Sequence, residues 1–194
     1  MINILLDSSN IYLSVGLMKD DKLLDFVSYE SWQTQSENMV PELDKLLEKH
    51  QINRNDITGV ITSIGPGSYT GVRISLTIAK TIALALDVPI YPVSSLHILK
   101  QDNSPSICVI NARSGRSYFG VYKGSEVIVS DCIKTNDEVK AYIEEHKDNV
   151  VCGDAKYLGL ANNDTNVCKQ MVSLFIDLKP VENHLGLKPI YMKD

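Results

Sequence analysis

Apolar and polar residues in the first half of the chain alternate with the periods of strands and helices. Residues 2–6 form a continuous apolar run, residues 11–17 alternate, and residues 23–29 form a further apolar stretch. This pattern predicts an antiparallel meander of three strands. From Met39 to His50, apolar residues recur at helical spacing, which predicts an amphipathic helix. Two starts fit this helix: a capping box at Thr34 and Glu37, or a first turn near Asn38 that contains Pro41.

A polar, proline-containing segment at residues 101–105 separates this half from a second unit. Strands are predicted at 107–110, 117–122, 126–129 and 149–152, with a helix whose capping box is Thr135 and Glu138. Residues 167–176 fit either a helix or a strand. Two units that each begin with strand, hairpin and strand predict an α/β fold with internal pseudo-symmetry. We expect one unit at residues 1–103 and a smaller one at 104–194.

The stretch 65–86, GPGSYTGVRISLTIAKTIALAL, follows a predicted strand at 57–64 and joins a glycine-rich turn to a long helix. Gly65, Gly67 and Gly71 allow the backbone to adopt positive φ and to approach another group closely. The helix is apolar on two opposite sides, and its only charge after Arg73 is Lys80. A helix of this kind is normally buried on more than one side, within its domain or against a partner.

Composition and charge narrow the class of protein. The chain has 194 residues, 44% of them hydrophobic and 22% charged, which is typical of a soluble globular protein. Its net charge of −5 argues against a surface that itself wraps nucleic acid. The four cysteines lack C-x-x-C spacing, so we expect reduced, mostly buried thiols. With no signal peptide and no membrane span of about 20 apolar residues, a cytoplasmic location is expected.

Candidate chemistry centres on two turns. Asp7 and Ser8, in the first turn, could hold a phosphate or a magnesium-bound water, yet such residues are also common in turns for structural reasons. The Gly65 turn leads into a helix N-terminus, a position that binds anions. However, Val72 and Arg73 follow Gly71 where a P-loop needs Lys and Ser or Thr, and Gly71 is one residue late for a dinucleotide fingerprint. We therefore expect this turn to pack against another backbone, with anion binding as the alternative.

The four histidines and the paired carboxylates form no catalytic set.

The run from Gly65 to Arg73 resembles the signature G-P-G-[SF]-[FY]-T-G-[VL]-R of the bacterial TsaB (YeaZ-like) family. Four further segments match that family in the right order: LLDSS at 5–9, QSENMVP at 35–41, NARSGRSY at 111–118 and PIY at 189–191. The resemblance covers the chain well to about residue 122. Gln35, Asn111 and Arg116 depart from the His, Asp and Glu that are usual in the family.

This resemblance implies the two-subdomain actin, sugar-kinase and Hsp70-like fold (ASKHA, ribonuclease H-like), with a reduced second subdomain. It also implies a non-catalytic role in making N6-threonylcarbamoyladenosine (t6A) beside the tRNA anticodon. The chemistry would belong to a catalytic paralogue, TsaD, joined by a small ATPase, TsaE. ATP or ADP and a metal are then expected on these partners and no cofactor on this chain, which would meet tRNA only through the complex. The H-x-x-x-H metal pair of the catalytic relative is reduced here to His97.

By the same likeness, the helices that start near Ser36 and Ser68 would form a four-helix interface with the partner, or a homodimer when the partner is absent. The residues expected at this interface are Met39, Leu43, Tyr69, Arg73, Leu76, Thr77 and Lys80. The alternative function is a nucleotide-dependent enzyme of the same superfamily, a kinase or a peptidase-like hydrolase, that uses Asp7 and the Gly65 turn.

Overall fold

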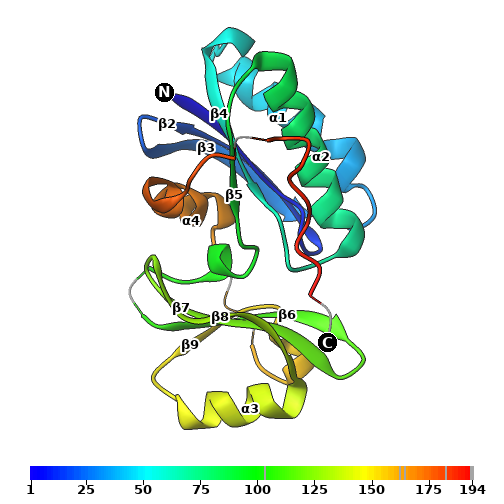
Figure 1. Cartoon of the computed structure of the whole chain (residues 1–194), viewed down its shortest axis with the longest axis vertical. Helices are drawn as coiled ribbons and strands as arrows, with labels where there is room; N and C mark the ends of the chain where they lie inside the picture. The colour runs from blue at the N-terminus through cyan, green and yellow to red at the C-terminus, as the bar shows by residue number, and fades with distance from the viewer. Residues whose placement is uncertain (103, 162, 164, 182, 193–194) are drawn as a thin grey trace.

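The computed structural model of the chain describes residues 1–102, 104–161, 163, 165–181 and 183–192. Two β-sheets lie toward opposite ends of the long axis, and each has helices packed on it (Figure 1). The predicted α/β class is confirmed. The predicted boundary between the halves falls on Asn103, outside the described residues, and the division into two domains stays a prediction. No described helix is long and apolar enough to cross a membrane.

The first sheet begins with the predicted meander and adds two parallel strands, in the order β3-β2-β1-β4-β5. Its strands are β1 (Ile2–Asp7), β2 (Tyr12–Lys19), β3 (Lys22–Glu30), β4 (Ile57–Ser63) and β5 (Ile90–Val93). The four-stranded second sheet has the order β8-β7-β6-β9 and repeats the plan of two antiparallel neighbours followed by a parallel strand. Its strands are β6 (Ser106–Arg113), β7 (Arg116–Lys123), β8 (Glu126–Thr135) and β9 (Val150–Gly153).

Helices cover both faces of the first sheet, and one covers the second sheet (Figure 1). The α-helices are α1 (Gln35–Lys49), α2 (Tyr69–Leu86), α3 (Asn136–Glu145) and α4 (Val167–Leu174). Short 3-10 helices lie at η1 (Arg54–Asp56), η2 (His97–Leu99), η3 (Lys156–Leu158) and η4 (Phe175–Asp177). In β1, Ile4 and Leu6 pack with α1 and α2, whereas Leu5 packs with Cys168 and Met171 of α4. β1 is therefore buried along its whole length.

The start of α1 matches the first of the two predicted positions but lacks the capping box predicted there. The helix begins at Gln35 and includes Pro41 in its second turn, so it does not start near Asn38. Thr34 occupies the N-cap position but makes no capping bond, because its hydroxyl pairs with Ser31 and Asn38 instead. The capping box predicted at Thr34 and Glu37 is therefore wrong.

Other sequence predictions hold. The capping box at the start of α3 is present, with Thr135 and Glu138 bonding each other's backbone N–H groups. Residues 167–174, which the sequence left between helix and strand, are helical. All four cysteines are free thiols, and three of them are buried.

The two halves share a hydrophobic core, which joins the sheets. Leu5 and Ile61 of the first sheet belong to the same buried cluster as Cys108 and Cys152 of the second. A polar link lies beside this cluster, where the hydroxyl of Ser94 donates to one oxygen of Asp131 at 2.6 Å and Tyr122 donates to the other. The shared core and the Ser94–Asp131–Tyr122 link together hold the two sheets in position relative to each other.

Candidate functional site

The glycine-rich turn packs against the first turn of the chain, between β1 and β2. A Cβ atom at Gly71 would overlap the carbonyl oxygen of Ser8, and one at Gly67 would overlap that of Ser9. The N–H of Ser68 donates to the Ser9 carbonyl at 2.7 Å, and the Ser68 hydroxyl accepts from the Gly71 N–H as the N-cap of α2. The two turns meet backbone to backbone, as the structural interpretation of the glycines predicted.

Gly65 has a different close neighbour, the C-terminal segment. Its φ is +103°, and an added Cβ would lie 2.8 Å from the carbonyl oxygen of Ile190. Its N–H donates to the hydroxyl of Ser95 at 3.0 Å, and its carbonyl accepts from the Ser95 N–H at 2.9 Å. The turn is therefore held on three sides by this chain's own atoms.

Asp7 and Ser8 lie behind this contact. The hydroxyl of Ser8 donates to the Gly71 carbonyl at 2.7 Å. One carboxyl oxygen of Asp7 accepts from the Ser63 hydroxyl and from the Ser9 N–H, while the other has no hydrogen-bond partner in the described part of the chain. Asp7 is only 1% exposed and Ser8 is fully buried. Neither side chain lines the cleft, so neither is placed to contact a ligand there.

The buried carboxyl of Asp7 predicts a pH dependence of stability. Burial raises its pKa above the ordinary value of 3.8. The folded state then binds more protons than the unfolded state, so this contribution to stability is complete below pH 3.8 and is lost as the pH rises through the folded pKa. Asp7→Asn removes the titration. In urea unfolding at a series of pH values, the variant should gain stability relative to the wild type as the pH rises, whereas parallel profiles would contradict this.

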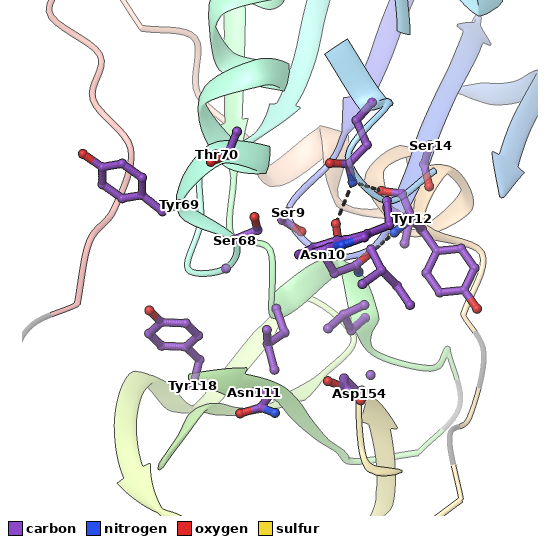
Figure 2. Close-up of a pocket in the computed structure, with 18 of the residues that line it drawn as sticks. Ser9, Asn10, Tyr12, Ser14, Ser68, Tyr69, Thr70, Asn111, Tyr118 and Asp154 are labelled. Carbon is purple, nitrogen blue, oxygen red and sulfur yellow. Dashed lines mark hydrogen bonds between the residues drawn. The ribbon is translucent and has the colours of Figure 1, made fainter. Parts of the chain in front are cut away.

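A cleft with a cavity volume of about 980 Å³ lies between the two halves. Figure 2 shows one wall made by the turn after β1 and the start of α2, and the facing wall made by the second sheet. Among its labelled residues, Ser9, Asn10, Tyr12, Ser68 and Thr70 lie on the first wall, and Asn111, Tyr118 and Asp154 lie on the other. These residues bring hydroxyl, amide and aromatic groups to the lining, and aliphatic side chains complete it.

Charged groups in the described lining are limited to Asp154 and Arg113. Burial raises the pKa of Asp154. Gln35, one of the departures from the family pattern, lines the cleft but points its amide at the backbone, donating to the carbonyls of Asn10 and Tyr12 at 2.7 and 3.0 Å. An amide NH2 carries two donors, which suits it to hold these two carbonyls at once.

The other two departures lie on the hairpin of the second sheet. The Asn111 side chain accepts from the N–H of Arg113 at 2.8 Å, and Arg116 is exposed at the start of β7. Both therefore lie near the turn that joins β6 to β7.

His97 is engaged within the chain. Its ring stacks on Tyr122 with 4.2 Å between centroids, and Nε2 lies 3.0 Å from the carbonyl oxygen of Gly124. Burial lowers its pKa. Within the described ranges, no three His, Cys, Asp or Glu side chains come together as a metal-binding group.

Met39, Leu43 and Leu76, which the sequence placed at a partner interface, are buried in this chain's own core, with exposures of 0%, 6% and 3%. The prediction that they contact a partner directly is wrong. The apolar stripe of α1 and the most buried side of α2 both face the first sheet. The second apolar side of α2, with Ile74 and Ile78, is half-buried against the same cluster. The chain itself therefore covers both apolar sides of α2.

The other expected interface residues lie on the outer side of α2. Tyr69, Arg73 and Thr77 are exposed, and Lys80 is half-buried. Leu84 continues this strip with 54% exposure, and Val40 of α1 is 49% exposed. The sequence analysis missed Leu84 as a surface residue and counted Val40 in the buried stripe. A helical wheel could have predicted that Leu84 shares the exposed side of Arg73 and Thr77. At 100° per residue, these three positions lie within about 40° of one another.

Comparisons with known proteins find relatives that are named for the threonylcarbamoyladenosine modification of tRNA. The sequence profile of TsaD, described as tRNA N6-adenosine threonylcarbamoyltransferase, matches residues 30–170. The tRNA threonylcarbamoyladenosine biosynthesis protein TsaB of Bacillus subtilis is 32% identical over 178 residues, which are 86% of this chain and 73% of that protein. TsaB of Buchnera aphidicola subsp. Schizaphis graminum is 30% identical over 141 residues, covering 70% of this chain and 67% of that protein.

A solved structure gives the fold independently. A Pseudomonas aeruginosa protein described as uncharacterized, with similarity to peptidase YEAZ, superposes with a TM-score of 0.81 over 99% of both chains at 20% identity. The α/β fold of the ASKHA (ribonuclease H-like) type expected from the sequence is therefore confirmed. Given the identity and coverage of its relatives, the chain belongs to the TsaB (YeaZ-like) family.

Proposed function

We propose that this chain acts in the biosynthesis of tRNA threonylcarbamoyladenosine as a non-catalytic subunit that binds a TsaD-type paralogue. The observation that carries the proposal is the closed glycine turn. The Ser9 carbonyl accepts from the Ser68 N–H inside this turn, and Asp7 is buried behind it. The outer strip of α2 is exposed instead.

The partner would pack on the outer strip of α2 and the neighbouring part of α1. Tyr69, Leu84 and Val40 contribute large exposed apolar groups to this face. Exposed apolar groups of this size favour association with a partner. In the absence of the partner, a homodimer through the same face is the expected state. In the complex, ATP or ADP and the metal would belong to the TsaD-type and TsaE-type subunits, and tRNA would be met through them.

Reconstitution tests this function. A TsaD-type subunit, a TsaE-type ATPase, tRNA and the threonylcarbamoyl donor are combined with and without this chain, and t6A is measured in nucleosides from the digested tRNA. We expect modification to depend on the chain. Asp154→Asn, which removes the carboxylate of the cleft, should support modification as well as the wild type does. Equal rates with and without the chain would contradict the proposal.

A second candidate is a nucleotide-dependent enzyme, and the cleft of about 980 Å³ between the halves favours it. Its lining combines apolar surface with hydroxyl and amide groups and adjoins the N-terminus of α2, which suits a nucleotide. Calorimetric titration of ATP into the isolated chain separates the two candidates. Sub-millimolar affinity accompanied by turnover, lost in Asp154→Asn, would favour the enzyme over the binding subunit.

A further inference from the structure

The C-terminal segment, residues 183–192, lies along α2 (Figure 1, red). The Ile190 N–H donates to the carbonyl of Ile64 at 2.7 Å, and the ammonium of Lys80 donates to the carbonyl of Leu185 at 3.2 Å. The segment therefore brings the terminal Pro-Ile-Tyr sequence, residues 189–191, next to the glycine turn. Two motifs that are more than 100 residues apart in the chain become neighbours.

Arg73 lies over the ring of Tyr69 at this meeting point, and the ring of Tyr191 lies beside both of them. Its guanidinium carbon lies 3.6 Å from the ring centroid of Tyr69 and 5.3 Å from that of Tyr191. The two rings are 5.2 Å apart, and Arg73 Nε donates to the Tyr191 hydroxyl at 2.6 Å. In Figure 2, Tyr69 points away from the second sheet and toward the C-terminal segment. The guanidinium is thus fixed in one orientation although Arg73 is exposed.

The acceptors that this guanidinium finds in the described part of the chain are tyrosine side chains. A guanidinium has five N–H donors, and the bond to the Tyr191 hydroxyl uses the single one on Nε. No carboxylate in the described part of the chain lies within ion-pair distance of Arg73. The group that such a guanidinium fits best is a carboxylate.

We propose that Arg73 is an anchor that pairs with a carboxylate side chain of the TsaD-type subunit, and that the C-terminal segment positions it through Tyr191. The inference rests on the proposed function and adds the chemistry of the contact. A planar guanidinium held by stacking matches a carboxylate with two parallel N–H donors, and little rotamer entropy remains to be lost on binding. Arginines and tyrosines are also the residues that most often dominate binding energy at interfaces.

The test measures affinity for the TsaD-type subunit by calorimetry at low and high salt. Arg73→Gln should weaken binding by about tenfold or more and reduce its salt dependence. The matched control, Lys140→Gln on α3 at the far end of the molecule, removes the same charge and should bind as the wild type does (Figure 1). Equal affinity of the two glutamine variants would overturn the inference while leaving the proposed function intact.

Tyr191 tests the positioning role separately. Tyr191→Leu removes the ring and the hydroxyl and should weaken binding several-fold, whereas Tyr191→Phe keeps the ring and should restore most of the affinity. Thermal unfolding of each isolated variant checks that the fold is unchanged, which is expected because Tyr191 is 42% exposed. If Tyr191→Leu binds as tightly as Tyr191→Phe, the positioning role fails.

If Arg73→Gln weakens only the homodimer, a second copy is the acidic partner and the inference is overturned. If the wild type itself does not bind, the proposed function fails.

Discussion

Gly71→Ala is expected to lower the free energy of unfolding by about 3 kcal/mol or more, the upper end of the range for overpacking a close-packed site. The added methyl group would overlap the carbonyl oxygen of Ser8, which is backbone and cannot rotate away. Relief would require the turn after β1 to separate from α2, breaking the bond from the Ser8 hydroxyl to the Gly71 carbonyl. For a chain of this length, the melting temperature should fall by about 6–12 °C.

Gly159→Ala is the matched control. It makes the same chemical change at a position where an added Cβ meets no atom within 4 Å. Its φ of +82° makes alanine unfavourable there by about 1 kcal/mol, so a small loss is expected. Calorimetric melting of both variants measures the difference. If Gly71→Ala melts within a degree or two of Gly159→Ala, the close contact between the two turns is not the reason for this glycine.

Thr77→Arg is expected to weaken binding of the TsaD-type subunit by about 100-fold or more while leaving the isolated chain folded. Thr77 lies in the middle of the exposed strip of α2, where two helices packed face to face would be about 8–10 Å apart. A long charged side chain would hold the helices apart or be buried without a counter-ion. Arginine favours helix, so the fold itself should not suffer. Co-purification and calorimetry measure the loss.

Ala141→Arg provides the control for charge and size. Ala141 is an exposed small residue of α3, which packs on the second sheet at the other end of the molecule (Figure 1). This variant should bind the partner as the wild type does. Undiminished binding by Thr77→Arg would move the interface away from α2. Leu76→Arg would not answer the question, because Leu76 is 3% exposed and its replacement would disrupt the core.

Local patterns predicted most of the elements correctly. The meander, the amphipathic α1, the long α2 and the capping box of α3 all follow from periodicity and from residues within four positions of one another. The capping box of α1 was the exception. The residues of a capping box are present in the sequence. The hydroxyl of Thr34 nevertheless pairs with that of Ser31 instead of capping the helix.

The candidate site was less predictable, because it depends on which surfaces meet. Two sides of α2 are apolar in the sequence, and the pattern could not say that both are covered by the same chain. Asp7 and Ser8 have the composition of a ligand-binding turn, yet contact with Gly71 seals them. The sequence assigned no role to Tyr191, although it belongs to a segment that matches the family. Its hydrogen-bond partner, Arg73, lies 118 positions earlier, and no local pattern links residues so far apart.

The sequence by itself therefore determined the order and type of most elements and the mismatch with both phosphate-binding patterns, because these depend on periodicity and on short spacings. Only the tertiary structure decided that Met39, Leu43 and Leu76 face inward, that Ser8 and Ser9 leave room only for glycine at 71 and 67, and that Tyr191 bonds Arg73. The physical reason is the range of the interaction. Periodicity records which residues share a face, whereas the neighbour that covers each face is chosen by packing between distant segments.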